Sequence, residues 1–174
     1  MKIRAFVTLA ALLGCGAMAA QEPAQPAAPA DQLHLGNRMV QAVQYPYDQK
    51  VKFDRLFSTG RVKDISGSAE ILRKKTIAVQ VDLDAPPASQ LKPEYKGYVV
   101  WALAPGGKFV NLGSIERKGK LKTTVADLPA FGIVISAEPD LKAASPTDAV
   151  LESGMPDARK RFYPIYRVFY KPKN

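Results

Sequence analysis

The chain of 174 residues carries 25 Lys and Arg against 16 Asp and Glu, a formal charge of +9, and is 47% hydrophobic. This length suits one globular domain rather than two, and the 14 Pro and 12 Gly favour turns over long helices. A single Cys excludes internal disulfides and thiolate metal clusters, and a single His argues against imidazole catalysis. The composition therefore argues against most catalytic classes more firmly than it favours any one function.

The N-terminus is typical of an export signal. Two cations, Lys2 and Arg4, precede an uncharged and mostly apolar run over residues 5–13. Even when extended to Ala20, the run is about 16 residues and rich in Ala, whereas a transmembrane helix needs roughly 20 apolar residues. We therefore expect an exported protein.

Two cleavage sites stay open, and they predict different attachments. Residues 12–15, Leu-Leu-Gly-Cys, resemble the bacterial lipobox, so that residues 1–14 would be removed and the Cys15 thiol would carry a diacylglyceride. Acyl chains contribute about 0.8 kcal/mol per buried CH₂, which predicts lasting membrane attachment. Alternatively, Ala17-Met18-Ala19 is a small-x-small site, and cleavage near residues 19–20 would discard Cys15. The position of the only Cys directly after Leu-Leu-Gly favours the lipoprotein.

A tether follows the signal. Residues 21–31, QEPAQPAAPAD, place Pro at three-residue spacing among small and polar side chains. Such a segment favours an extended polyproline-like conformation of about 3 Å per residue, on the order of 30 to 40 Å in all. We expect a linker over residues 15–32, a short connecting segment or helix over residues 33–44, and the folded domain over residues 45–174.

Beyond residue 45 the hydrophobicity alternates with period two. Residues 76–83 predict a strand with one buried face, and residues 98–103, apolar on both faces, predict a central strand followed by a hairpin turn at Pro105-Gly106-Gly107. Further strands are expected over residues 51–57, 68–72, 108–113, 120–125, 132–137, 149–152 and 163–170. Eight or nine short strands predict an all-β fold, a single antiparallel Ig-like β-sandwich.

The middle of the chain resembles a known kind of extracytoplasmic domain. The motifs are Tyr98-Val99-Val100-Trp101-Ala102, Asn111-Leu112-Gly113, Phe131-Gly132, Ser136-Ala137-Glu138-Pro139, Ser145-Pro146-Thr147 and Val150-Leu151. They resemble the C-terminal domain of the anti-sigma-K factor (RskA-type) proteins and, more closely, an uncharacterised envelope domain often found in front of OmpA-like modules. The resemblance covers roughly residues 66–152 and implies a β-sandwich on the outer side of a membrane. Sigma-factor regulation and cell-wall binding are not expected here, because we recognise neither a sigma-binding part nor an OmpA-like module.

Individual motif residues have structural interpretations. Trp101 is expected to fill the core between the sheets, with an exposed sugar-stacking platform as the alternative. Glu138-Pro139-Asp140 is expected to end a strand and order a loop. His34 lies beside the linker, where it is unsuited to a catalytic triad.

Few carboxylates are placed for catalysis or metal binding. Asp82 and Asp84 share one face of a strand, but a calcium site needs further oxygen ligands that the neighbouring sequence lacks. We expect no catalytic residue, metal or cofactor, while paired carboxylates of a polysaccharide-cleaving enzyme remain open.

The positive charge concentrates near the C-terminus. Removal of Lys2 and Arg4 from the formal +9 leaves +7, and no acid follows Asp157. The cations Arg159, Lys160, Arg161, Arg167, Lys171 and Lys173 are interleaved with Phe162, Tyr163, Tyr166, Phe169 and Tyr170. For an exported protein this pattern predicts contact of Arg159, Lys160, Arg161, Lys171 and Lys173 with an anionic envelope surface rather than nucleic acid. The alternative is a final strand whose aromatics pack inward and whose cations face solvent.

The sequence thus predicts a non-catalytic envelope lipoprotein, a tethered β-sandwich that binds or scaffolds other envelope components. Its predicted partners are the membrane, through the lipid, and another envelope protein or an anionic polymer. The alternatives are a soluble periplasmic or secreted protein- or glycan-binding module and an enzyme that uses carboxylates alone.

Overall fold

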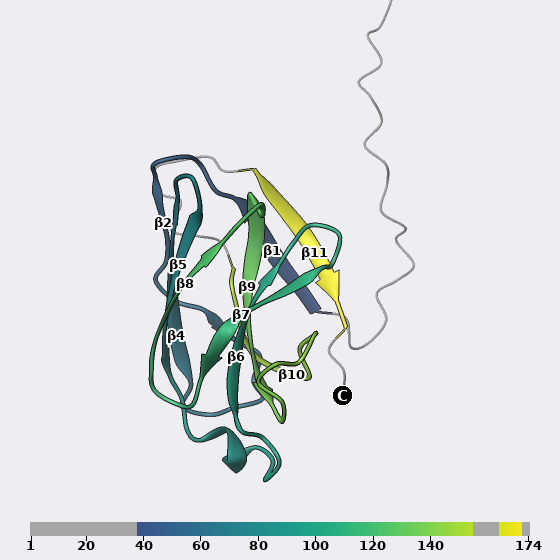
Figure 1. The fold of residues 1–174 in the computed structure, drawn as a ribbon. Coiled ribbons are helices and arrows are strands. Elements are labelled where there is room, and N and C mark those ends of the chain that lie inside the picture. Colours follow the sequence, from purple (N-terminus) through teal and green to yellow (C-terminus); the bar gives the residue numbers. More distant parts are fainter. Residues whose placement is uncertain (1–37, 155–163, 172–174) are drawn as a thin grey trace, which may run out of the picture. The chain divides into compact units, whose positions relative to one another are not determined.

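The computed structural model describes residues 38–154 and 164–171 of the chain. Within these ranges the regular structure is β, apart from one 3-10 turn, η1, at Ala88–Gln90. Two antiparallel sheets pack together, so the predicted all-β sandwich is confirmed (Figure 1). In chain order the strands are β1 Arg38–Gln44, β2 Lys50–Phe53, β3 Phe57–Ser58, β4 Ser66–Arg73, β5 Ile77–Asp84, β6 Gly97–Leu103, β7 Phe109–Ile115, β8 Gly119–Val125, β9 Ala130–Glu138, β10 Asp148–Glu152 and β11 Ile165–Tyr170. In these same ranges no helix has the length and apolarity that crossing a membrane requires.

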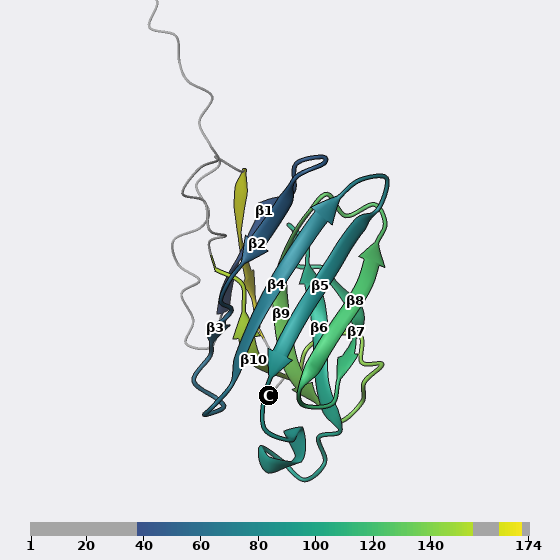
Figure 2. The ribbon, with the colours of Figure 1, turned by 90° about the vertical axis from the view of Figure 1, so that its left-hand side faces the viewer.

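The strands divide into a four-stranded and a seven-stranded sheet. The four-stranded sheet has the order β2-β4-β5-β8 and lies toward the viewer in Figure 2. In the seven-stranded sheet β9 is central: β6 and then β7 extend from one edge, while β10 and β1 share the other. β11 pairs with β1, and β3 pairs with β10.

The burial pattern separates strands with one buried face from strands with two. β5 buries Ile77, Val79, Val81 and Leu83 and leaves the intervening side chains exposed or half-buried. Every residue of β6 and of β9 is buried. The seven-stranded sheet therefore has apolar packing on both of its faces.

The first core lies between the two sheets. It combines inward residues of the four-stranded sheet, such as Ile71 and Val81, with Val100 and Ile133 of the seven-stranded sheet. The second core lies on the opposite face of the seven-stranded sheet and consists of Val40, Ala42, Val99, Trp101, Leu103, Val134, Ala149, Val168 and Tyr170.

Trp101 lies in the second core, so the expectation that it fills the space between the sheets is wrong. Successive residues on a strand point to opposite faces, and Val100 and Ala102 take the first core. Trp101 is fully buried and is not an exposed stacking platform. Its ring packs edge-on against Phe109 at a centroid distance of 6.0 Å, and Phe109 packs edge-on against Tyr170 at 5.3 Å. β11 therefore covers part of this core.

The segment before Tyr45 also differs from the prediction. Instead of a connecting piece or a helix, residues 38–44 form β1, so the folded domain begins before residue 45. Residues 38–44 form a strand because they pair with β11 and because Val40 and Ala42 are buried in the second core. A prediction from local sequence cannot detect a strand partner more than 100 residues away in the chain.

The strand predicted over residues 51–57 is two strands. β2 pairs with β4, whereas β3 pairs with β10 in the other sheet. The chain crosses between the sheets at residues 54–56, where the buried Leu56 donates its amide to the carbonyl of Gly67. With β1 this makes eleven strands in the described ranges instead of eight or nine, and the other predicted strands have ends within two residues of the observed ones.

Glycine permits two local features of this fold. Gly106 and Gly107 have φ of +91° and +83°, which confirms the hairpin turn predicted between β6 and β7. Gly132 lies where β1 passes β9. An added Cβ there would stand 2.4 Å from Val40 Cγ1 and 2.8 Å from the carbonyl oxygen of Gln41.

Candidate functional site

Most residues predicted to contact a lipid or an anion lie outside the described residues. They are Cys15, Arg159, Lys160, Arg161 and Lys173. Lys171 is described: it follows β11 directly and is exposed. A candidate surface is therefore built from Lys171 and the strand that precedes it.

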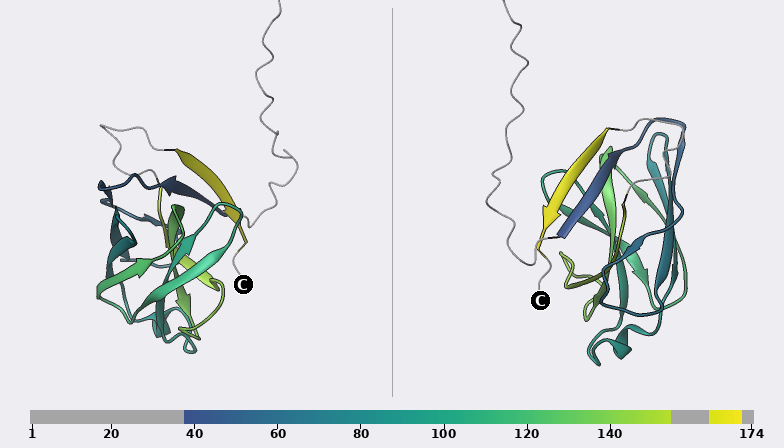
Figure 3. Two further views of the ribbon diagram at one scale, coloured as in Figure 1. Left: turned by 45° about the horizontal axis from the view of Figure 1, so that its top comes forward. Right: turned by 180° about the vertical axis from the view of Figure 1, so that it is seen from behind.

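β1 and β11 lie side by side as a two-stranded antiparallel ribbon at one edge of the seven-stranded sheet (Figure 3). The register places Met39 opposite Phe169 and Val40 opposite Val168. Opposite residues share a face and successive residues alternate, so the ribbon has two different faces. One face brings Val40 and Val168 into the second core. The other carries Val43 and Ile165, which pack in the first core at one end of the ribbon, and Met39 and Phe169, which are exposed at the other end.

This outward face combines an exposed apolar pair with two cations. Met39 is 43% exposed and Phe169 is 55% exposed. Arg167 lies two residues before Phe169 and shares its face of β11, and Lys171 follows the end of the strand two residues after Phe169; both are exposed. Among the described residues, no carboxylate forms an ion pair with either cation. We call Met39, Arg167, Phe169 and Lys171 the ribbon face.

The C-terminal aromatic residues were expected either to contact an anionic surface or to pack inward, and in the ribbon they point both outward and inward. Tyr170 packs inward and is buried, as the structural interpretation predicts. Phe169 points outward between Arg167 and Lys171, so the inward-packing interpretation is wrong for this residue. Met39 was not recognisable from the sequence, because its segment lacked a visible strand partner.

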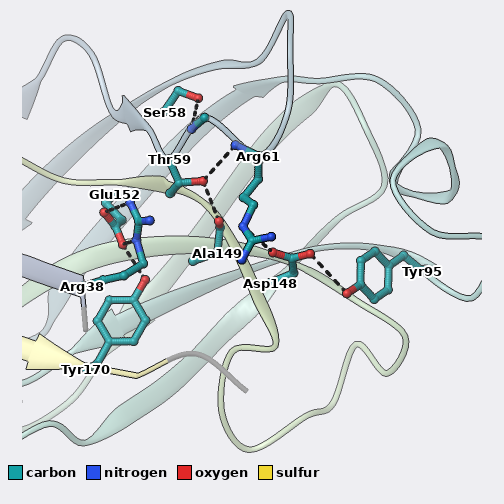
Figure 4. A network of polar contacts seen from close by, with 10 residues as sticks. Arg38, Ser58, Thr59, Arg61, Tyr95, Asp148, Ala149, Glu152 and Tyr170 are labelled. Atoms are coloured by element: carbon teal, nitrogen blue, oxygen red, sulfur yellow. Dashed lines mark hydrogen bonds and ion pairs between the residues drawn. The ribbon is translucent and has the colours of Figure 1, made fainter. Parts of the chain in front are cut away.

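A partly buried ionic network holds the ribbon to β10 (Figure 4). Glu152 accepts hydrogen bonds from Nε and Nη2 of Arg38, the latter at 2.8 Å, and from the Tyr170 hydroxyl at 2.5 Å. The hydrogen bond to Glu152 raises the pKa of Arg38, while burial, followed by the charge of Glu152, raises the pKa of Tyr170. The guanidinium therefore stays charged and the hydroxyl stays neutral. Arg38 and Tyr170 both donate their hydrogen bonds to Glu152, so the three side chains hold strands together rather than face a ligand.

A second network in Figure 4 surrounds the start of β10. Asp148 accepts a hydrogen bond from the Tyr95 hydroxyl at 3.4 Å and lies 3.7 Å from Nε of Arg61. The Thr59 hydroxyl donates to the carbonyl of Ala149 at 2.7 Å. An open hollow of about 490 Å³ beside it is lined by these charged residues together with Lys63, Asp64 and Lys92. Cations and carboxylates face one another here, so the hollow has no single charge preference.

Motif residues that carry the family resemblance form a buried hydrogen-bond chain. Trp101 Nε1 donates to Ser136 Oγ at 2.7 Å, and Ser136 donates to Glu138 Oε1 at 2.5 Å. The Thr147 amide donates to the same Glu138 oxygen at 2.6 Å. Glu138 is fully buried at the end of β9 and holds the following loop, as predicted. These hydrogen bonds give the motif residues a structural role, while the second carboxylate oxygen of Glu138, Oε2, is buried without a hydrogen-bond partner among the described residues.

The carboxylates considered for catalysis line an open groove of about 590 Å³ on the four-stranded sheet. Asp84 lies 2.8 Å from Nζ of Lys118, and Asp82 lies 3.1 Å from Nζ of Lys120. Each carboxylate thus has its own cation, which favours a charge ladder across the sheet over acid–base catalysis. Among the described residues, no group of three or more His, Cys, Asp or Glu side chains is arranged to hold a metal ion.

Comparison with known proteins identifies no family or function for the chain. No protein-family model, no curated protein and no solved structure matches the chain. The function is therefore inferred from the sequence and from the geometry of the domain.

Proposed function

We propose that the chain is a non-catalytic lipoprotein of the bacterial cell envelope, whose β-sandwich is a tethered binding or scaffolding module. The observation that carries the proposal is Leu12-Leu13-Gly14-Cys15 after a short signal-like segment. Lipid on Cys15 would anchor the chain, and residues 16–32 would act as the spacer. The folded domain would then face the periplasm.

Features of the domain support binding more than catalysis. Asp82 and Asp84, which line the groove on the four-stranded sheet, are paired with lysines. Buried polar groups such as Glu138 and Glu152 belong to networks that hold loops and strands. Exposed cations and apolar side chains instead gather on the ribbon face. We propose that the basic C-terminal residues Arg159, Lys160, Arg161, Lys171 and Lys173 belong to the same contact with an anionic envelope surface.

Metabolic labelling with a clickable fatty acid in a bacterial host tests the anchor. We expect label on the wild-type chain and none on Cys15→Ser, because Cys15 is the only thiol that can carry the lipid. Ala19→Gln is the matched control: it disrupts the alternative small-x-small site and should leave labelling unchanged. Equal labelling of the wild type and Cys15→Ser would contradict the proposal.

A soluble module is the second candidate, and Ala17-Met18-Ala19 is the observation that favours it. Cleavage after this site would release a chain without the anchor. The intact mass of the purified mature protein separates the two. A chain that begins at residue 20 or 21 and carries no lipid would replace the lipoprotein by the soluble module.

A further inference from the structure

We propose that the ribbon face docks on an anionic phospholipid bilayer. Phe169 and Met39 would insert among the head groups, while Arg167 and Lys171 would bind lipid phosphates. The inference deepens the proposed function and rests on it for placing the domain beside an envelope membrane.

The apolar part of the ribbon face is a pair rather than a scattered residue. Met39 and Phe169 are cross-strand partners, and about half of each side chain is exposed. Tyr47, Phe57 and Tyr166 are exposed as well, but none of them has an exposed apolar cross-strand partner. Tyr47 packs under the guanidinium of Arg73 at 4.0 Å, and the Tyr166 hydroxyl donates to Gln44 at 3.3 Å. Amphipathic elements that lie in a membrane interface combine apolar side chains with Lys and Arg in this way.

The charge of the ribbon face is not neutralised by its own strands. Residues 38–44 and 165–171 contain no Asp or Glu, so Arg167 and Lys171 face outward without a neighbouring carboxylate on β1 or β11. The outer face of the four-stranded sheet is different. There Lys50 lies 2.8 Å from Glu70, and Lys120 lies 3.1 Å from Asp82. The ribbon face is therefore complementary to an anionic surface, whereas on the sheet face several lysines are paired with carboxylates of neighbouring strands.

In the sequence, Met39 of the ribbon face lies close to the proposed tether. β1 begins at Arg38, one residue before Met39, and the proposed linker precedes it. A lipid on Cys15 would make docking effectively intramolecular, because the proposed linker of about 30 to 40 Å keeps the domain within reach of the bilayer. Docking therefore needs only modest intrinsic affinity. The Arg38–Glu152–Tyr170 network holds the ribbon in place beforehand, so little conformational entropy is lost on contact.

Co-sedimentation with vesicles tests the inference. The mature chain from residue 16, made without lipid, is mixed with vesicles of phosphatidylcholine or of phosphatidylcholine with phosphatidylglycerol. We expect partitioning into the anionic vesicles only. It should weaken with added salt, because the Debye length falls from about 10 Å at 0.1 M to about 3 Å at 1 M.

Two variants separate the contributions. Each cation near an anionic surface contributes about 1 kcal/mol, or about fivefold, so Arg167→Gln with Lys171→Gln should lower the partition coefficient about 25-fold. Phe169→Ser removes a half-exposed apolar side chain and should lower it roughly fivefold. The matched controls are Lys63→Gln with Lys122→Gln, which removes the same charge elsewhere, and Phe57→Ser, since Phe57 is 57% exposed.

Fluorescence of Trp101 and thermal unfolding check that each variant is folded. Equal partitioning into neutral and anionic vesicles, or equal losses in the ribbon variants and their controls, would overturn the inference. Binding to isolated cell-wall polymer without binding to vesicles would also overturn it. Fatty-acid labelling of Cys15 is independent of these results, so failure of the anchor and failure of the docking face are distinguishable.

Discussion

Glu152 is the residue on which the attachment of the ribbon depends. It lies on β10, accepts hydrogen bonds from Arg38 on β1 and Tyr170 on β11, and is only 8% exposed. A carboxylate in this position has lost most of its water, so its burial is offset only while both partners remain. The network therefore contributes specificity to the position of the ribbon.

Glu152→Gln is expected to lower the free energy of unfolding by about 1–3 kcal/mol, because Arg38 loses its counter-ion and the hydrogen bonds become neutral. Urea unfolding followed by the fluorescence of Trp101 measures the change. The matched control is Glu70→Gln, since Glu70 lies 2.8 Å from the exposed Lys50 and such surface pairs contribute less than about 1 kcal/mol. Equal changes in the two variants would contradict the role of Glu152.

At the scale of elements, one face of β11 packs in the second core and the other is largely exposed. Val168 and Tyr170 pack into the second core, whereas Arg167 and Phe169 face outward. The strand is held by its register with β1, which pairs Val40 with Val168. A shift by one residue would exchange the two faces and bury Arg167.

Val168→Ala is expected to lower the free energy of unfolding by about 1–3 kcal/mol, because it removes buried methyl groups from the second core. Arg167→Ala, the neighbouring substitution on the exposed face, should change it by less than about 0.5 kcal/mol. Urea unfolding of both variants measures the difference. The reverse order of the two effects would mean that the register of β11 is different.

At the scale of the whole folded domain, two cores share one sheet and tyrosines are buried in both. Burial raises the pKa of the Tyr98 hydroxyl to about 12, and burial also raises the pKa of Tyr45 and of Tyr170. An unfolded tyrosine ionises near pH 10, so above that pH the unfolded chain has released protons that the folded domain retains. The stabilisation from Tyr98 is fully present below about pH 10 and is lost as the pH rises toward about 12.

We therefore expect the free energy of unfolding to fall as the pH rises above about 10. Tyr98→Phe should make this fall less steep, because the substituted side chain cannot ionise when the chain unfolds. Denaturant unfolding at neutral and alkaline pH measures the slope. Tyr47→Phe, at an exposed tyrosine, is the control and should leave the slope unchanged; an unchanged slope in Tyr98→Phe would refute the expectation.

Local pattern was enough to predict the all-β class and most of the strands. The alternation of Ile77, Val79, Val81 and Leu83 predicts β5 because strand side chains alternate with period two, whatever the strand pairs with. The turn at Gly106 and Gly107 is equally local. The charge of Arg167 and Lys171 could be read directly, and the lipid on Cys15 stays a prediction from sequence.

Which strands pair, and which core each strand face packs into, was decided only by the tertiary structure. Residues 38–44 become a strand because β11 pairs with them, and Trp101 takes the second core because its neighbours Val100 and Ala102 take the first. Met39 joins Phe169 only through that pairing. A hydrophobic period of two predicts that side chains alternate between the two faces of a strand. It does not predict which core each face packs into, because packing sets the register between distant strands.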